Sequence, residues 1–161
     1  MKFGGQVAKP IKYGYVGGGR VTLEYPVAAS QVFVHTGGAF VKLDANKRCD
    51  IADSGDAELL GWADTGAFTA SATAGVTIVP VIISVDSLFL LPTDVTRTEA
   101  QLRALVGETC DLIVATNVQY ADVGESNEDV IQIMGYQYYD ASNQAVVVRM
   151  NPNKLAATGV V

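Results

Sequence analysis

Histidine and cysteine are almost missing from this sequence, and their scarcity narrows the chemistry available to it. The chain of 161 residues has one histidine, His35, and two cysteines, Cys49 and Cys110. A zinc site draws most of its ligands from these residue types, and the two cysteines stand far apart with no CxxC spacing. We therefore expect no zinc site and no histidine-based catalysis. The cysteines are expected to be buried free thiols in a reducing compartment, with a disulfide between them as the alternative.

Charged residues and long apolar runs are also scarce. Charged residues make up 17% of the chain, against about 25% in ordinary soluble proteins, while hydrophobic residues make up 49%. The longest apolar stretch, Val76–Leu91, is interrupted by polar residues and by Pro80, and it is shorter than the roughly 20 residues that span a bilayer. Met1–Lys12 has no apolar segment typical of a signal peptide. These features predict a soluble protein without a membrane partner, whose apolar surface contacts another protein.

The charge is unevenly distributed along the chain. The net charge is −6, but residues 1–48 carry seven basic and two acidic side chains, and residues 49–161 carry four basic and fifteen acidic ones. The front of the chain is thus +5 and the remainder −11. An acidic total argues against nucleic acid as a partner. The basic front predicts either an acidic partner or neutralisation of the acidic body of the same chain or of a sister subunit.

Residue usage points to a mainly β fold. Valine occurs 22 times against 11 leucines, and threonine adds 12, which favours strands because β-branched side chains fit a pleated sheet. Residues 1–20 hold six glycines and Pro10, so we predict an extended, basic, Gly-rich N-terminal arm at 1–20 and a β domain at 21–161. Short strands at intervals of about 8–12 residues favour a small sandwich-like or barrel-like domain.

One short helix is predicted in the second half of the chain. Thr98 and Gln101 have the spacing of a capping box, and an apolar stripe follows before Gly107 ends the segment. These signals predict a helix over about 98–106. After the helix, short alternating stretches separated by turn residues, with one turn at Thr116-Asn117, predict further strands.

Two earlier segments also give strand predictions. Gln31–His35 and Phe40–Asp44 alternate around a Gly-rich turn and together predict a hairpin. We expect its valines to face the core and its phenylalanines to face outward, where they would form a contact surface. The apolar stretch Val76–Leu91 predicts one or two buried strands, broken near Pro80 or at Asp86-Ser87.

No segment has the spacing of a known catalytic or metal site. Four acidic residues in Asp50–Glu58 fall at positions that do not match an EF-hand, so a solvated acidic loop is the favoured interpretation. The glycines of Gly17–Arg20 precede a strand, whereas phosphate-binding loops precede a helix. Glu125, Glu128 and Asp129 lie in a polar turn, where we expect solvated carboxylates and no glycosidase pair. The sequence predicts a protein that is not an enzyme, with no cofactor and no metal.

The C-terminal third resembles a family of viral proteins. Four segments carry the resemblance: Val106–Ala115 (VGETCDLIVA), Val118–Val123 (VQYADV), Asp129–Gly135 (DVIQIMG) and Ala145–Pro152 (AVVVRMNP). With the predicted helix before them, they are similar over residues 88–155 to the capsid decoration (cement) proteins of tailed bacteriophages. Proteins of that family are non-enzymatic and often oligomeric, and they tie shell subunits together at their junctions against the pressure of the packaged DNA.

The resemblance implies a structural virion protein that binds the exterior of a phage capsid after being made in the host cytoplasm. Its implied partners are the major capsid protein and further copies of itself, as a dimer or trimer. Many decoration proteins carry an arm that lies along the capsid lattice, and residues 1–20 are the equivalent expected here. The side chains expected to contact the shell or a sister subunit are Lys2, Lys9, Lys12, Tyr13, Tyr15 and Arg20.

A second hypothesis is a carbohydrate- or receptor-binding β module of a phage tail or surface adhesin. Such a module would present exposed aromatic side chains beside Asp or Asn at one end of the fold. Trp62 with Asp64, or the Tyr136–Tyr139 group, are the candidates in the sequence. Reproducible binding to glycans would favour this hypothesis over the capsid protein.

Overall fold

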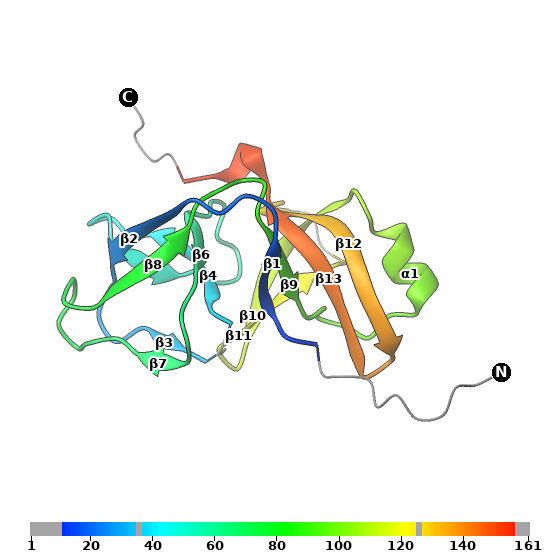
Figure 1. Cartoon of the computed structure of the whole chain (residues 1–161), viewed down its shortest axis with the longest axis horizontal. Helices are drawn as coiled ribbons and strands as arrows, with labels where there is room; N and C mark the ends of the chain where they lie inside the picture. The colour runs from blue at the N-terminus through cyan, green and yellow to red at the C-terminus, as the bar shows by residue number, and fades with distance from the viewer. Residues whose placement is uncertain (1–10, 35–36, 125–126, 157–161) are drawn as a thin grey trace.

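The computed structural model describes residues 11–34, 37–124 and 127–156, and these residues form two β lobes side by side along the long axis of the molecule (Figure 1). Strands dominate both lobes, and among the described residues one short α-helix lies at the outer side of one lobe. The expectation of a mainly β domain with one short helix is therefore confirmed. Lys2, Lys9, His35 and Glu125 lie outside the described residues.

The first lobe is a six-stranded antiparallel sheet that curls on itself. In order across the sheet, its strands are β1 (Gly14–Gly17), β9 (Leu88–Leu91), β13 (Asn143–Met150), β12 (Ile131–Asp140), β10 (Thr109–Ala115) and β11 (Val118–Asp122). The curl brings the end of β9 to β11, where Thr93 forms a parallel bridge with Ala121. The Ala121 amide donates to the Pro92 carbonyl at 2.9 Å. The sheet is therefore a half-barrel with a core on its concave side.

The second lobe is a five-stranded antiparallel sheet with a small ladder beside it. Its strands, in order, are β2 (Thr22–Pro26), β8 (Ile78–Ile82), β6 (Gly61–Ala63), β4 (Ala39–Leu43) and β5 (Cys49–Ile51), and the ladder consists of β3 (Val32–Phe33) and β7 (Phe68–Thr69). This sheet also curls, because Val27, just after β2, forms a parallel bridge with Cys49 of β5. The Ala28 amide then donates to the Cys49 carbonyl at 2.8 Å.

The helix α1 (Glu99–Ala104) begins where the sequence predicts it. The Thr98 side chain accepts a hydrogen bond from the Gln101 amide, and the Gln101 side chain accepts one from the Thr98 amide at 2.8 Å, so the capping box is confirmed. Leu102 is buried and anchors the helix to the first lobe. Gly107 follows with φ +97°, a conformation that favours glycine. No described helix is long and apolar enough to cross a membrane.

Residues 22–82 form the second lobe and are inserted between β1 and β9 of the first lobe. The chain crosses between the lobes just before β2 and returns just after β8, and the two crossings touch each other. Gly18 has φ +83°, and a Cβ atom there would lie 2.1 Å from the Asp86 carbonyl oxygen. Only glycine fits this position. The buried Ser87 hydroxyl donates to the Gly19 carbonyl and fastens the same crossing.

The C-terminal segment also joins the lobes. The short 3-10 helix η1 (Pro152–Lys154) follows β13 and directs the chain back toward the second lobe. There the Leu59 amide donates to the Lys154 carbonyl at 2.9 Å, and the Ala156 amide donates to the Leu59 carbonyl at 2.7 Å. The second lobe is thus held by the segments before β2, after β8 and after β13.

A central core lies between the two sheets. Phe40, Trp62 and Ile82 occupy opposed positions on β4, β6 and β8, so they point to the same face of the five-stranded sheet. There they meet Phe89 of β9, whose ring centre lies 5.0 Å from Trp62 and 5.2 Å from Phe40. All four side chains are at most 1% exposed. Aromatic pairs at such separations contribute about 0.5–1.5 kcal/mol beyond the area they bury.

A distal core lies on the opposite face of the five-stranded sheet. Val41, Ala63 and Val81, each the chain neighbour of a central-core residue, point to this side and are fully buried. The β3–β7 ladder covers them, with Phe33 stacked on Phe68 at a ring separation of 5.0 Å. Because the sheet is buried on both faces, its central strands carry apolar residues in succession instead of alternating with polar ones.

The predicted hairpin over residues 31–44 is wrong. β3 pairs with β7, while β4 pairs with β5 and β6. The predicted inward face is right for Val41, which is fully buried, but wrong for the rest: Phe33 and Phe40 are at most 2% exposed, whereas Val32 is 42% and Val34 38% exposed. Burying a phenylalanine removes more apolar area from water than burying a valine, so the aromatic faces turn inward.

Three other boundaries differ from or refine the sequence predictions. Residues 14–17, predicted to lie in the arm, form β1 and pair with β9, so the β fold begins before residue 21. Residues 49–51, predicted to lie in an acidic loop, form β5. The stretch Val76–Leu91 forms two strands, with the break over residues 83–87 and with Pro80 inside β8. Pro80 makes no hydrogen bond to Glu24 of β2, and on its other side it faces Asp64, just past the end of β6, whose amide donates to the Pro80 carbonyl at 2.9 Å. An amide hydrogen is therefore missing only where the β6 ladder has ended.

Candidate functional site

The predicted contact residues lie along the segment that leads through β1. Lys12 is exposed, and Tyr13 is half-buried, where burial and the neighbouring Tyr120 raise the pKa of its phenol. Tyr15 packs against the central core, with its ring 6.1 Å from Phe89 in an edge-to-face arrangement. Its hydroxyl donates to the Gly18 carbonyl at 2.9 Å. Tyr15 therefore fastens β1 to the body of its own chain.

Arg20 is also engaged within the chain. Its guanidinium lies 5.1 Å from the centre of the Tyr15 ring, within the range of a cation–π contact. The same guanidinium forms an ion pair with the Asp64 carboxylate on the second lobe. Arg20 lies in the crossing that precedes β2, and its contacts link that crossing to both lobes.

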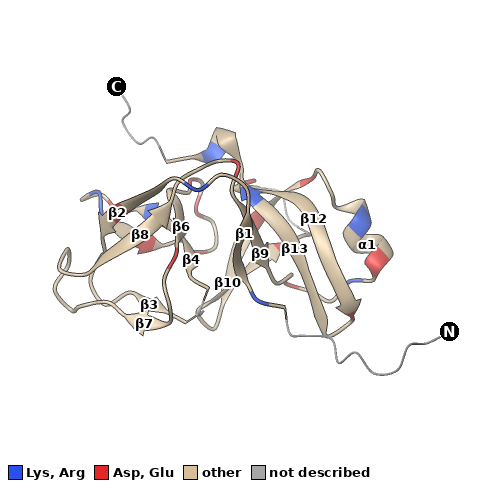
Figure 2. Ribbon diagram, in the orientation of Figure 1, with Lys and Arg blue, Asp and Glu red and all other residues tan. Residues whose placement is uncertain are grey.

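Basic and acidic residues are mixed along the ribbon of both lobes (Figure 2). Besides Arg20 with Asp64, the ammonium of Lys42 lies 2.7 Å from the Asp56 carboxylate. Both pairs join a basic residue of the front of the chain to an acidic residue of the remainder. The chain therefore neutralises part of its own charge asymmetry, as one of the two sequence interpretations requires. Such partly exposed pairs contribute at most about 1 kcal/mol each, so they balance charge more than they hold the fold.

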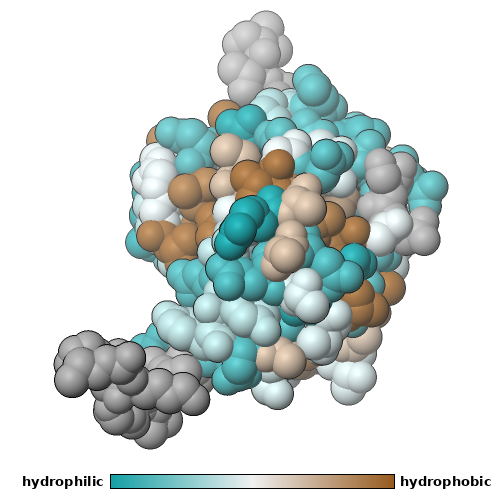
Figure 3. Space-filling view, turned by 90° about the vertical axis from the view of Figure 1, so that its right-hand side faces the viewer, coloured by the Kyte–Doolittle hydropathy of each residue, from teal (hydrophilic) through white to brown (hydrophobic). Residues whose placement is uncertain are grey.

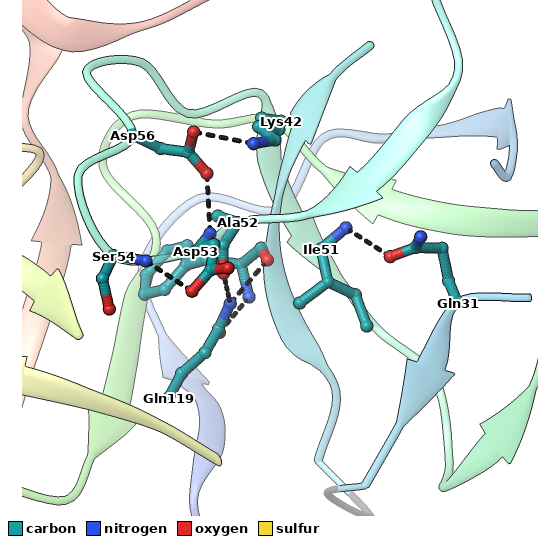
Figure 4. Close-up of polar contacts among 9 residues, drawn as sticks. Gln31, Lys42, Ile51, Ala52, Asp53, Ser54, Asp56 and Gln119 are labelled. Atoms are coloured by element: carbon teal, nitrogen blue, oxygen red, sulfur yellow. Dashed lines mark hydrogen bonds and ion pairs between the residues drawn. The ribbon is translucent and has the colours of Figure 1, made fainter. Parts of the chain in front are cut away.

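Gln119 of β11 joins the two lobes through a buried hydrogen-bond network (Figure 4). Its side-chain oxygen accepts from the Phe40 amide at 2.7 Å. Its side-chain nitrogen donates to the carbonyls of Phe40 at 2.9 Å and Ala52 at 2.8 Å. The side chain is 2% exposed, so all these groups are shielded from water. One glutamine thus satisfies three backbone groups of the neighbouring lobe.

A polar groove of about 360 Å³ lies beside this network, between β5 and the tip of the β10–β11 hairpin. Its lining residues are Ser30, Gln31, Val32, Lys42, Asp50, Ile51, Ala52, Asp53, Val114 and Asn117. The Gln31 side chain accepts from the Ile51 amide at 3.1 Å and so occupies the outer edge of β5 (Figure 4). Burial raises the pKa of the Asp50 carboxyl.

The side chain of Asp111, in β10, points into the acidic turn that precedes β12. Its carboxylate is 8% exposed and accepts hydrogen bonds from the amides of Asn127 at 3.1 Å, Glu128 at 2.8 Å and Asp129 at 2.7 Å. Three amide donors to one carboxylate hold the turn in place. The turn includes Asp129, whose φ is +56°. Within the described ranges, no cluster of three or more His, Cys, Asp or Glu residues is arranged to hold a metal ion.

The aromatic residues proposed for sugar binding have different environments. Trp62 is 1% exposed and donates its ring N–H to the Gly37 carbonyl at 2.8 Å, so it presents no face to a ligand. The Tyr136 hydroxyl lies within hydrogen-bond distance of Glu99 and Arg103 of α1. Tyr138 packs partly against the buried core, and Tyr139 has 56% of its surface exposed. A single exposed ring is a weak platform for a glycan.

Comparisons with known protein families, with curated proteins and with solved structures found no match to this chain. Two surfaces of the described residues each expose a pair of apolar side chains, and they lie in different lobes (Figure 1). Contiguous apolar surface on a soluble protein commonly marks a contact with another protein.

The first, the β2–β8 surface, lies at the edge of the five-stranded sheet. We define it by Val21 and Leu23, which lie on the same face at the start of β2, beside the end of β8. Val21 is 56% exposed and Leu23 is 47% exposed. Since β2 ends the sheet, this surface combines apolar side chains with the edge of a strand.

The second, the α1 surface, lies on the first lobe at the far side of the molecule. We define it by Val106, which is 45% exposed, and Met134, which is 41% exposed. The Gly107 amide donates to the Ile133 carbonyl at 2.8 Å, which brings the end of the helix beside β12. Figure 3 shows this side of the molecule, where hydrophobic surface is exposed between hydrophilic side chains.

Cys49 and Cys110 are both free and buried, as predicted. Burial raises the pKa of each thiol to about 12. In the unfolded chain a thiol has a pKa of about 8.5, so burial of the neutral thiols stabilises the fold below that pH and this contribution is lost as the pH rises toward 12.

We expect neither thiol of the folded protein to react with DTNB at about pH 8, because the thiolate is the reactive form. Both should react at once when the same sample is unfolded in guanidinium chloride. The amount of thionitrobenzoate released gives the number of reactive thiols in the folded and in the unfolded protein. Rapid reaction of one thiol in the folded protein would show that its site opens to solvent.

Sequence reasoning missed both Gln119 and Asp111. Gln119 stands in an alternating strand, where a glutamine usually faces water, and only the approach of the second lobe makes it a buried link. Asp111 lies between apolar residues of β10, and an acid in that setting is a signal of a satisfied buried carboxylate. That signal was available in the sequence, although its partners were not.

Proposed function

We propose that this chain is a structural virion protein that binds the outer surface of a phage capsid at junctions between major capsid subunits and stabilises the shell. The observation that carries the proposal is the pair of apolar surfaces, β2–β8 and α1, in opposite lobes of one elongated molecule. A protein that ties neighbours together needs at least two contact surfaces, whereas a simple ligand-binding module needs one. Each surface then joins a shell subunit or a sister copy.

The sequence resemblance supports the same proposal. Residues 88–155, which are similar to decoration proteins, include β9 to β13 and α1, and thus most of the first lobe with its α1 surface. Repetition over many identical junctions makes weak individual contacts sufficient for occupancy of a shell. Lys12 and Tyr13, with Lys2 and Lys9 before them, are proposed to contact the shell or a sister subunit. Tyr15 and Arg20 hold that segment against the body.

Co-sedimentation with shells assembled from the major capsid subunit tests the proposal. Wild-type protein is expected to sediment with the shells, and Val106→Glu is expected to bind at least about tenfold more weakly, since burying an unpaired carboxylate costs more than the 1.4 kcal/mol that corresponds to tenfold. Removal of residues 1–10 tests Lys2 and Lys9 in the same assay without deleting β1.

Val32→Glu is the matched control for this assay, because Val32 is 42% exposed against 45% for Val106 and lies on neither surface. It should bind as the wild type does. Failure of the wild type to sediment with any shell, or equal loss in both glutamate variants, would contradict the proposal. Specific binding to glycans without binding to shells would support the carbohydrate-binding module instead.

A further inference from the structure

Among the described residues, the strand β2 has a neighbouring strand along only one of its edges. It is the last strand of its sheet and pairs with β8 only. The Ile83 amide donates to the Val21 carbonyl at 2.9 Å, and the Val27 amide donates to the Thr77 carbonyl at 2.8 Å. Since backbone groups alternate along an antiparallel strand, the odd-numbered residues bond to β8. The amide and carbonyl groups of Thr22 and Glu24 therefore point away from the sheet.

Apolar side chains accompany this open edge. Leu23 lies opposite Val81 and Tyr25 opposite Val79, so both point to the face that carries the distal core. Leu23 is 47% exposed and Val21, at the open end, 56% exposed, while Tyr25 packs partly against the core. The bridge at Val27 closes only the other end of the strand. The distal core thus ends at an incompletely covered strand, which is a template for pairing with another chain.

We propose that β2 pairs antiparallel with β2 of a second copy of this chain, around a twofold axis that passes beside Leu23. Thr22 then exchanges two backbone hydrogen bonds with Glu24 of the second copy, and Glu24 exchanges two with Thr22 of the second copy. The two Leu23 side chains face each other across the axis and cover each other's exposed surface. The two five-stranded sheets become one continuous sheet.

The side chains on β2 select this register and a second copy as the occupant. An axis at Glu24 would place two carboxylates directly opposite each other and would set Thr22 against Pro26, which has no amide hydrogen to donate. An axis at Thr22 would pair Arg20 with Glu24 of the second copy. Arg20 is already bound to Asp64 and Tyr15 of its own chain. An axis at Leu23 places each acid opposite a neutral threonine and each exposed leucine opposite an identical one. The strand is therefore self-complementary, as a twofold interface requires.

The contact is small, and this determines its expected strength. A single pair of short strands buries less than the roughly 1,200–2,000 Å² of a standard stable interface. The dimer is therefore expected to be reversible and to form as the protein concentration rises. It requires no shell, so its failure would leave the proposed capsid function untouched, and failure of shell binding would leave the dimer untouched.

Sedimentation velocity over a dilution series tests the association. The wild type is expected to shift with concentration toward twice the 17.0 kDa mass of one chain. Leu23→Lys should remain at the mass of one chain, because two ammonium groups would face each other across the axis. Val32→Lys, at a similarly exposed valine on β3, should dimerise as the wild type does. A wild type that stays monomeric, or a Leu23→Lys variant that still dimerises, overturns the proposal.

Disulfide trapping tests the register separately. In the proposed dimer the two Leu23 Cα atoms are about 4.5 Å apart, within the range that a disulfide spans. Leu23→Cys treated with diamide is therefore expected to give a covalent dimer on non-reducing gels, while Thr22→Cys and Glu24→Cys should not. The native thiols do not interfere, because both are buried. Trapping through Thr22→Cys or Glu24→Cys in place of Leu23→Cys would show that the axis lies elsewhere.

Discussion

Gln119→Leu is expected to lower the free energy of unfolding by at least about 2 kcal/mol, because it removes the partner of two buried backbone groups at about 1–3 kcal/mol each. The Phe40 amide and the Ala52 carbonyl bond to this side chain, and both lie in the second lobe while Gln119 belongs to the first. The Phe40 carbonyl also accepts from Gln119, but it keeps the Ala52 amide as a donor at 3.0 Å. Leucine has a similar volume, so the loss measures the hydrogen bonds and not a cavity. Urea denaturation followed by tryptophan fluorescence gives the free energy.

Gln137→Leu is the matched control for this measurement. Gln137 lies on β12 and is only half-buried, and the same substitution there should change stability by less than about 0.5 kcal/mol. Because the network joins the lobes, Gln119→Leu should also increase amide exchange of Phe40 relative to residues within β13. A loss below about 1 kcal/mol would mean that water replaces the glutamine in the network.

Local signals in the sequence predicted local structure well. The capping box at Thr98 and Gln101 involves groups three residues apart, so no distant part of the chain can alter it. The β10–β11 turn at Thr116-Asn117 has φ +53° and +63°, as a two-residue hairpin turn requires. In both cases the residues that decide the conformation are the residues that adopt it.

Strand pairing could not be predicted in the same way. Phe33 pairs with Phe68 and not with the next strand along the chain, because the β3–β7 ladder covers the distal core. Phe40 lies in the central core because Phe89, from the other lobe, completes its packing. These choices depend on which apolar faces meet after the chain has crossed twice between lobes. A pattern of alternating residues identifies a strand with two faces but does not say which face a distant sheet will cover.

The same limit applies to the candidate site. Tyr15 and Arg20 are aromatic and basic residues in a Gly-rich segment, a pattern typical of an extended contact arm. Their contacts to Phe89 and Asp64, more than 40 positions away, make them part of the body. The composition identified Tyr15 and Arg20 as contact residues of this segment, but it did not reveal that they contact other parts of the same chain.

Trp62→Ala is expected to destabilise the fold by about 3–5 kcal/mol, the usual cost of truncating a fully buried large aromatic side chain. The indole packs 4.8 Å from the Phe40 ring and 5.0 Å from the Phe89 ring, so its removal leaves a cavity between the two sheets. It also leaves the Gly37 carbonyl without the indole N–H, its donor at 2.8 Å. A thermal or guanidinium denaturation monitored by circular dichroism measures the loss.

Tyr139→Ala separates this structural role from a role in recognition. Tyr139 is 56% exposed, so its truncation should cost less than about 0.5 kcal/mol. If the protein were a glycan-binding module that used exposed aromatic rings, Tyr139→Ala would abolish binding while leaving the fold intact. If it is a capsid protein, Trp62→Ala should reduce shell binding only in proportion to the fraction unfolded. A folded Trp62→Ala protein of wild-type stability would contradict the assignment of Trp62 to the centre of the core.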